Sequence, residues 1–230
     1  MRIVYDSQIF CAQTYGGISR YFCELASRLH RQSEVDVSIT APMHINAYLE
    51  HVPPGVVRGF RAPRLGSDGT GYARLALRGM GMLLGDFMLR AMSPDIVHET
   101  YFFSYRLGPR NARRVLTIHD MIHEKFPSNF PYGDKTARHK ARAAARADHI
   151  ICVSESTRDD AIEILGLSPD RLSVIHHGFD LMAVPAIGRQ EKGSPVDGPF
   201  LLYVGNRHGY KNFVVPTICA CQRVCLSFAV

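Results

Sequence analysis

The chain has 230 residues, of which 46% are hydrophobic and 21% charged, so its length fits either one large domain or two small ones. This composition is typical of a soluble globular protein with enough apolar material for a sizeable core. The formal net charge of +6 favours anionic partners such as nucleotide diphosphates, acidic lipids or nucleic acid, without choosing among them.

The hydropathy pattern indicates a protein without a membrane span. No stretch approaches the ~18 apolar residues of a transmembrane helix, and Asp86 and Arg90 interrupt the most apolar window, GMGMLLGDFMLRAM. The start, MRIVYDSQIF, has one positive charge and then a strand-like run, with Asp6 where a signal peptide needs an apolar core. We therefore expect a cytoplasmic protein whose six cysteines are free thiols.

Strand-like and helix-like segments alternate along the chain. The first strand is expected at 2–5, followed by a loop that runs to Gly16–Gly17 and then by a helix. The apolar face of this helix is formed by Ile18, Tyr21, Phe22, Leu25 and Leu29. Residues 42–71 are rich in Pro and Gly and are expected to be irregular, with VVRGF as a candidate short strand. Further strands are expected at 35–41, 95–100, 113–120, 149–154 and 172–178, and further helices at 72–92, 135–147 and 155–166.

This alternation predicts an α/β fold: a Rossmann-like, doubly wound and mostly parallel sheet between helices. Several of the strands are apolar on both faces, as in sheets that helices cover on both sides. Right-handed crossovers place every strand-to-helix loop at one sheet edge, where ligands bind near the topological switch point.

The composition changes after residue 180. Residues 181–198 contain two Pro, three Gly and no structural period, and we interpret them as an interdomain linker. PFLLYVGN at 199–206 then begins a second set of strands. The sequence thus predicts one complete α/β domain at 1–180 and a second domain that is barely begun at 199–213.

Two motifs fall at predicted strand ends. Gly16 and Gly17 precede a helix, so a ligand phosphate can approach the backbone and the unpaired N–H groups of the first turn. A glycine pair also makes ordinary turns, and the G-x-G-x-x-G spacing is absent. His119 and Asp120 end the strand at 113–120, where a histidine can bond a substrate hydroxyl or simply cap the strand. His123 lies four residues further on, but its loop-like surroundings argue against a metal pair.

The next strand-to-helix junction is SESTRDDAIEIL. Ser156 with Asp159 resembles a capping box, and Ser154 is placed to contribute to it. This capping role explains the acidic residues, so we favour it over a metal site. Ser154 and Glu155 lie at the strand end, and a minor ligand role for them stays open.

The helix at 135–147 carries two stripes. Lys135, Arg138, Arg142 and Arg146 form a basic stripe, and Ala137, Ala141, Ala144 and Ala145 form a second one that allows close packing on the sheet. The basic stripe is either a solvated face or a contact with anionic lipid headgroups at the inner membrane surface. Because aromatic residues do not alternate with these cations, we expect no nucleic-acid partner.

A second cationic motif follows the strand that begins the second domain. In YVGNRHGYKN, Arg207 and Lys211 come after Gly205 at the expected start of a helix. Arg can bond two phosphate oxygens at once, and Lys adds a point charge. Such a pair can hold a diphosphate leaving group and stabilise its charge without a metal ion or cofactor.

Taken together, these segments resemble the family 4 retaining glycosyltransferases with the GT-B fold. The matching stretches are GGISRYFCELASRL, DIVHET, VLTIHDMIHEKFP, ADHIICVSESTRDDAIEILGLSPDRLSVIHHGFD and YVGNRHGYKNF, and they cover most of 1–213. The resemblance implies two Rossmann-like domains, the first binding mainly the acceptor and the second mainly the nucleotide sugar. It also implies transfer of a hexosyl group, with mannosyl as one option, to a saccharide or lipid-linked acceptor of the cell envelope.

By position, the resemblance assigns roles to individual residues. Gly16 and Gly17 match the glycine loop near the donor phosphates, and His119 matches the histidine that contacts the transferred sugar. Arg207 and Lys211 match the diphosphate-binding basic pair. Asp120, Ser154 and Glu155 remain candidates for acceptor or sugar contacts.

The chain departs from the family pattern after Lys211. The family's Glu-x7-Glu motif does not follow, and residues 214–230 hold one charged residue, no glycine and three cysteines. We interpret this aberrant tail as a truncated or frame-shifted end and expect weak or absent transfer by this chain. Two other functions stay open: a non-catalytic module that binds an acceptor or docks a partner, and a fragment of a nucleotide-sugar epimerase.

Overall fold

The computed structural model describes residues 1–62 and 71–178, without the side chains of 71–74, 77 and 78. These residues belong to two units, one made of 1–121 with 135–176 and the other of 122–134 with 177–178. The predictions for 181–198, 199–213 and 214–230, and the roles of Arg207 and Lys211, lie outside the described residues. The domain boundaries of the sequence analysis therefore stay predictions.

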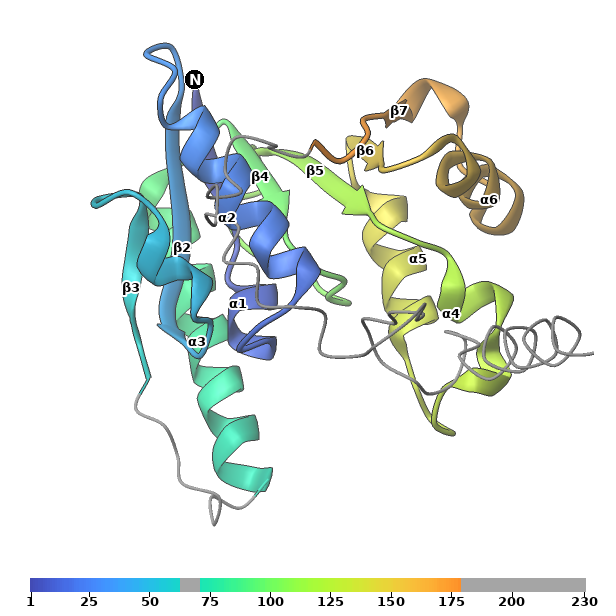
Figure 1. The fold of residues 1–230 in the computed structure, drawn as a ribbon, viewed down its shortest axis with the longest axis horizontal. Helices are drawn as coiled ribbons and strands as arrows, with labels where there is room; N and C mark the ends of the chain where they lie inside the picture. Colours follow the sequence, from blue (N-terminus) through green and yellow to red (C-terminus); the bar gives the residue numbers. More distant parts are fainter. Residues whose placement is uncertain (63–70, 179–230) are drawn as a thin grey trace, which may run out of the picture. The chain divides into compact units, whose positions relative to one another are not determined.

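The first unit is a sheet with helices on both faces (Figure 1). Its seven described strands are all parallel, in the order β3-β2-β1-β4-β5-β6-β7. The strands are β1 Arg2–Tyr5, β2 Asp36–His44, β3 Val57–Arg61, β4 Ile96–Glu99, β5 Arg113–Ile118, β6 His149–Cys152 and β7 Leu172–Val174. The main helices are α1 Gln8–Ala12, α2 Gly17–Leu29, α3 Gly71–Met92, α5 Thr136–Arg146 and α6 Glu155–Leu165. The prediction of a Rossmann-like parallel sheet is confirmed.

The alternating residues of β1 contribute to two separate cores. On β1, Tyr5 packs with Phe22 of α2 on one face of the sheet, and Val4 packs with Leu89 of α3 in a different cluster. Successive strand residues point to opposite faces, so each strand contributes to two apolar layers. A third cluster joins β5 and β6 to α5 and α6 through Leu116, Ile150 and other apolar residues.

The structure contains short elements that the sequence pattern did not predict. The segment expected as a loop before Gly16 contains helix α1, and short 3-10 turns lie at Tyr48–His51 and Pro169–Arg171. The candidate strand at VVRGF is present as β3, at the edge of the sheet. Gly166 adopts a left-handed conformation with φ of 64° and ends α6, as expected of a glycine at a helix C-terminus.

The cap of α6 corrects one prediction. The capping residue is Ser154 and not Ser156, because the Ser154 side chain accepts a hydrogen bond from the backbone N–H of Thr157 at 3.1 Å. Helix α6 therefore begins at Glu155, two residues earlier than a box formed by Ser156 and Asp159 would allow.

The second unit contributes a short helix, α4 Ile122–Lys125, and a 3-10 turn at Pro127–Asn129. Within it, the imidazole of His123 stacks on the ring of Phe130, with centroids 3.8 Å apart. Among the helices of both units, we find no described run with the length and apolar character needed to cross a bilayer. Cys11, Cys23 and Cys152 are buried free thiols, as predicted for them.

Candidate functional site

The topological switch point lies between β1 and β4. From β1 the chain winds outward to β2 and β3, then returns to β4 on the other side of β1. In open sheets of this kind, ligands bind outside the carboxyl ends of the strands at this point. Asp6 follows β1 there and Thr100 follows β4, so these two residues mark the edge where a site is expected.

Asp6 and Thr100 hold the two strand ends together. The fully buried carboxylate of Asp6 accepts hydrogen bonds from the Thr100 backbone N–H at 3.0 Å and from its hydroxyl at 2.6 Å. It also accepts one from the side-chain amide of Gln8 at 2.6 Å, in α1. Burial raises the pKa of Asp6, and the hydrogen bonds from Thr100 and Gln8 act in the opposite direction. In the sequence, Asp6 stands out only as a break in the apolar start of the chain.

His119 directly follows β5 at this same edge and is half-buried. Its imidazole stands edge-on to the ring of Tyr21, with centroids 5.3 Å apart and planes at 87°. The ring of Phe22 lies edge-on at 6.2 Å. Both aromatic residues belong to α2, the helix that begins at Gly17, so the structure brings two predicted segments 100 residues apart into contact.

Buried hydrogen bonds connect β4, β5 and α2 next to these rings. The Nε2 atom of His98, in β4, is 2.8 Å from the hydroxyl of Thr117 in β5. Thr117 also hydrogen-bonds Tyr21. Burial, with a smaller contribution from His119, lowers the pKa of His98 to about 3, so this imidazole is neutral at physiological pH. His98 lies inside the quoted motif DIVHET, yet nothing in the sequence distinguished it from a strand residue.

The two glycines at the start of α2 differ in their surroundings. Gly16 has an extended backbone at the N-cap position, and its carbonyl accepts a hydrogen bond from the Ser19 hydroxyl at 3.0 Å. A methyl group added to Gly16 would lie 2.1 Å from Oε1 of Gln13, whereas one added to Gly17 would meet no atom within 4 Å. Open space at Gly17 is what the close approach of a ligand phosphate to a helix N-terminus requires.

Asp120 is held by a residue that the sequence analysis did not single out. Lys140 in α5 is only 1% exposed, and its Nζ donates a hydrogen bond to the Asp120 carbonyl at 2.7 Å. The Asp120 carboxylate lies 3.9 Å from the same ammonium, which also lies 5.3 Å from the ring centroid of Phe102. This lysine therefore fixes the loop that carries His119 and Asp120.

Ser154 and Glu155 have local roles. The Ser154 hydroxyl caps α6, and Glu155 forms an ion pair with Arg158 at 2.8 Å. Within the described ranges, the hydrogen bonds and ion pairs of their side chains all go to residues of this helix. A contact with an acceptor or a sugar stays a prediction for both residues.

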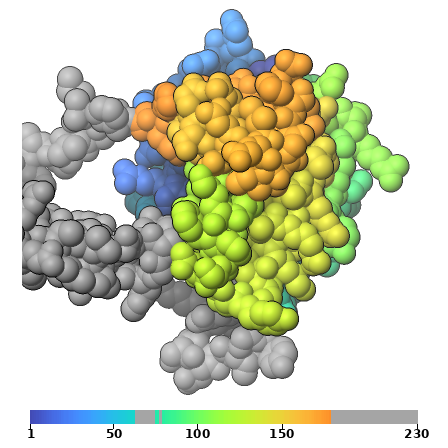
Figure 2. Space-filling model, turned by 90° about the vertical axis from the view of Figure 1, so that its right-hand side faces the viewer, coloured from blue at the N-terminus to red at the C-terminus, as the bar shows by residue number. Residues whose placement is uncertain are grey.

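Arg146 is a correction to the proposed basic stripe. Its guanidinium points into the protein and forms an ion pair with the buried carboxylate of Glu99. The Nη2–Oε2 distance is 2.7 Å and the Nε–Oε1 distance is 3.1 Å. Lys135, which precedes α5, and Arg138 and Arg142 on it remain exposed, and α5 reaches the surface in yellow in Figure 2. The alanine stripe is also revised, since Ala143 and Ala144 are buried and Ala145 is exposed.

Glu99 also faces a second cation. Arg114 in β5 is fully buried, and its Nη1 lies 3.6 Å from Glu99 Oε1. Another nitrogen of Arg114 donates to the carbonyls of Leu107 and Pro109. Burial raises the pKa of Glu99 against the opposing effect of Arg146. This ionic cluster joins the end of β4 to α5, and RRVLTI gave no sign that one of its arginines is internal.

Comparison with known proteins identifies the family. The model of the family described as Glycosyltransferase Family 4 matches residues 15–182. The chain belongs to Glycosyltransferase Family 4. The matched range includes the helix after Gly16 and Gly17 and the strand end that carries His119.

Individual relatives agree with this assignment. A D-inositol 3-phosphate glycosyltransferase from Thermobifida fusca is 30% identical in an alignment of 207 residues that covers 83% of this chain and 48% of that protein. An alpha-maltose-1-phosphate synthase from Mycolicibacterium smegmatis is 25% identical over 191 residues, which is 78% of this chain and 45% of that protein. The chain thus spans about half the length of the curated relatives it matches.

A solved structure of a UDP-N-acetylglucosamine 2-epimerase aligns over 75% of this chain and 46% of that one, with a TM-score of 0.45 and 13% identity.

Proposed function

We propose that this chain forms the acceptor-side part of a glycosyltransferase site, at which a hexosyl group passes from a nucleotide-diphosphate sugar to an acceptor. Family membership supports the reaction class. The observation that carries the proposal is the contact of His119 with Tyr21, because it joins the end of β5 to the helix that begins at Gly17. The imidazole and the open helix N-terminus are thereby placed at the same edge of the sheet.

Each residue has a role that its chemistry suits. The N-terminus of α2, with no side chain at Gly17, offers N–H groups and a partial positive charge to a donor phosphate. The His119 imidazole bonds a hydroxyl of the transferred sugar and stabilises the charge that develops as the sugar–diphosphate bond breaks. In this proposal Arg207 and Lys211 neutralise the diphosphate leaving group, so no metal ion or cofactor is required.

The acceptor is the finer part of the proposal. The names of the two relatives contain a phosphorylated cyclitol and a phosphorylated disaccharide, so a small phosphorylated polyol or sugar is the first acceptor class to test. A lipid-linked saccharide at the inner membrane face is the alternative that the exposed cations of α5 suggest, with Lys135, Arg138 and Arg142 facing the headgroups. A mannosyl donor is one member of the hexosyl class proposed here.

A transfer assay with the full 230-residue chain tests the proposal. Radiolabelled UDP-, GDP- and ADP-hexoses are supplied with inositol phosphate, hexose phosphates or a polyprenyl-linked saccharide, and labelled product is separated from donor. We expect at most weak transfer by this chain, to one acceptor class, and any such transfer should be lost in His119→Ala and retained in His51→Ala, which removes an exposed imidazole elsewhere. Acceptor binding without transfer would instead support a docking module. Isomerisation of the donor without acceptor would support an epimerase.

A further inference from the structure

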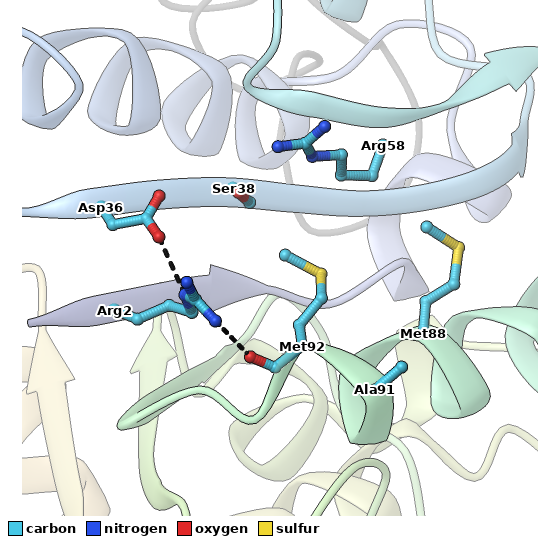
Figure 3. Close-up of a pocket in the computed structure, with 7 residues that line it drawn as sticks. All are labelled: Arg2, Asp36, Ser38, Arg58, Met88, Ala91 and Met92. Atoms are coloured by element: carbon cyan, nitrogen blue, oxygen red, sulfur yellow. Dashed lines mark hydrogen bonds and ion pairs between the residues drawn. The ribbon is translucent and has the colours of Figure 1, made fainter.

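A pocket lies at the amino-terminal edge of the strands, opposite the edge that carries His119. It has a volume of about 310 Å³ and opens between α3 and the amino-terminal halves of the first strands (Figure 3). Its lining residues are Arg2, Asp36, Ser38, Arg58, Met88, Ala91 and Met92. Because β1 begins at Arg2 and β2 begins at Asp36, this pocket is separate from the carboxyl-edge site.

The pocket arises from small residues in an otherwise apolar layer. Along β2, Val37 and Ile39 belong to the core that includes α2, and the intervening Ser38 points to the opposite face, which α3 covers. On α3, Ala91 lies between Met88 and Met92, whose side chains rise toward β2 in Figure 3. A serine facing an alanine leaves volume unfilled, and two flexible thioethers line it.

The polar groups of this pocket are unequally satisfied. The guanidinium of Arg2 already has protein partners. Its Nε lies 2.8 Å from Asp36 Oδ2, and its Nη1 donates to the Met92 carbonyl at 2.7 Å. Arg58 is exposed and forms no ion pair or side-chain hydrogen bond with any described residue. Ser38 is only 3% exposed, and its hydroxyl likewise has no hydrogen-bond partner within 1–62 and 71–178. Ser38 lines the pocket, so its hydroxyl is available to a ligand there.

We propose that this pocket binds a small amphiphilic anion: a phosphate or carboxylate head with a short alkyl chain. The ion pair of Arg2 with Asp36 is neutral, which leaves the pocket one net positive charge on Arg58. A guanidinium can hold two oxygens of one head group, and the Ser38 hydroxyl can donate a further hydrogen bond. The thioethers of Met88 and Met92 then contact the alkyl chain. A volume of about 310 Å³ suits a small ligand.

Methionine-methyl NMR of the full chain tests this site without any assay of activity. The probes are hexyl phosphate and hexanoate, with inorganic phosphate and hexanol as the head group and the chain alone. We expect both amphiphiles to shift the methyl resonances of Met88 and Met92 saturably, at concentrations about tenfold or more below those that either separate part requires. Equal binding of hexanol would overturn the anion requirement, and equal binding of inorganic phosphate would overturn the role of the alkyl chain.

Two variants and a control locate the binding. Arg58→Gln should weaken binding of hexyl phosphate about tenfold or more, and Ala91→Leu should abolish it by filling the cavity. Arg31→Gln removes the same charge from an exposed position outside the pocket and should leave the affinity within about twofold. Thermal melting of each variant separates lost binding from lost folding. A folded Arg58→Gln protein that binds like the wild type would refute the proposal, and so would an absence of ligand shifts at Met88 and Met92.

Discussion

The imidazole of His119 stands edge-on to the phenol ring of Tyr21, with ring centroids 5.3 Å apart and planes at 87°. This contact joins the carboxyl end of β5 to the second turn of α2. Edge-to-face aromatic pairs contribute about 0.5–1.5 kcal/mol beyond the area that they bury. Tyr21 therefore orients the residue proposed to contact the sugar, and it does so from the helix proposed to face the donor phosphates.

Replacing Tyr21 should separate ring packing from hydrogen bonding. Tyr21→Phe keeps the ring and loses only the bond to Thr117, so we expect a loss of about 1 kcal/mol in the free energy of unfolding. Tyr21→Ala also removes the wall beside His119 and should cost about 2–3 kcal/mol. Urea denaturation monitored by circular dichroism measures both changes. Equal losses in the two variants would show that the ring contributes nothing.

The buried His98 predicts a specific dependence of stability on pH. Its pKa is about 3 in the folded protein and about 6.5 in the unfolded chain, so the unfolded chain takes up the proton first as the pH falls. The stability that a neutral His98 provides is complete above pH 6.5 and is lost progressively toward pH 3. From pH 6.5 to 5 this residue should remove about 2 kcal/mol.

His98→Gln isolates that effect, because glutamine can still bond Thr117 but does not titrate. Unfolding free energies measured at intervals between pH 7 and 5 should fall less steeply in the variant than in the wild type. Carboxylates such as Asp6 and Glu99 titrate in both proteins and cancel in the difference. Parallel curves would show that His98 does not stay neutral when folded.

The ion pair of Arg146 with Glu99 should contribute strongly to the stability of the fold. Arg146→Leu leaves a buried carboxylate with Arg114 as its remaining cation, at 3.6 Å, and we expect a loss of about 3 kcal/mol. Arg142→Leu, on the exposed side of the same helix, should change stability by no more than about 0.5 kcal/mol. Denaturant midpoints of the two variants make the comparison. Similar midpoints would mean that Arg146 is no more important than a surface cation.

Gly17→Ala should distinguish a ligand role from a structural one. A methyl group at Gly17 meets no protein atom within 4 Å, and alanine favours helices, so stability should be unchanged or up to about 1 kcal/mol higher. If donor phosphates approach this backbone, the affinity for nucleoside diphosphates should fall about tenfold. Isothermal titration calorimetry with UDP, GDP and ADP measures this affinity in the wild type and the variant. Unchanged affinities for a nucleotide that binds the wild type would remove Gly17 from the site.

The exposed cations of α5 predict binding to anionic membranes. Each cation near such a surface contributes about 1 kcal/mol, so changing Lys135, Arg138 and Arg142 together to Gln should weaken binding to phosphatidylserine vesicles at least about tenfold. As a control, changing Arg31, Arg110 and Arg113 together to Gln removes the same charge from other exposed positions. Vesicle sedimentation at two salt concentrations provides the measurement. Equal losses in the two triple variants would indicate a response to net charge alone.

Local sequence patterns were enough to predict the parallel sheet and the end of α6. Runs such as VLTI are apolar on both faces, which only a strand covered by helices satisfies, and Gly166 tolerates the left-handed turn that ends a helix. The same local reasoning placed His119 at a strand end, because the apolar pattern stops there. These features depend on neighbouring residues alone.

Tertiary structure decided which way the long polar side chains of α5 point. Spacing put Arg146 in line with Lys135, Arg138 and Arg142, and it gave no reason to separate Lys140 from an ordinary surface lysine. Arg146 turns inward because it bonds the buried carboxylate of Glu99, 47 residues away in sequence. Lys140 turns inward because its ammonium donates to the Asp120 carbonyl. A flexible cation can reach solvent or a buried acceptor from the same backbone position, so only the position of a distant partner decides between them.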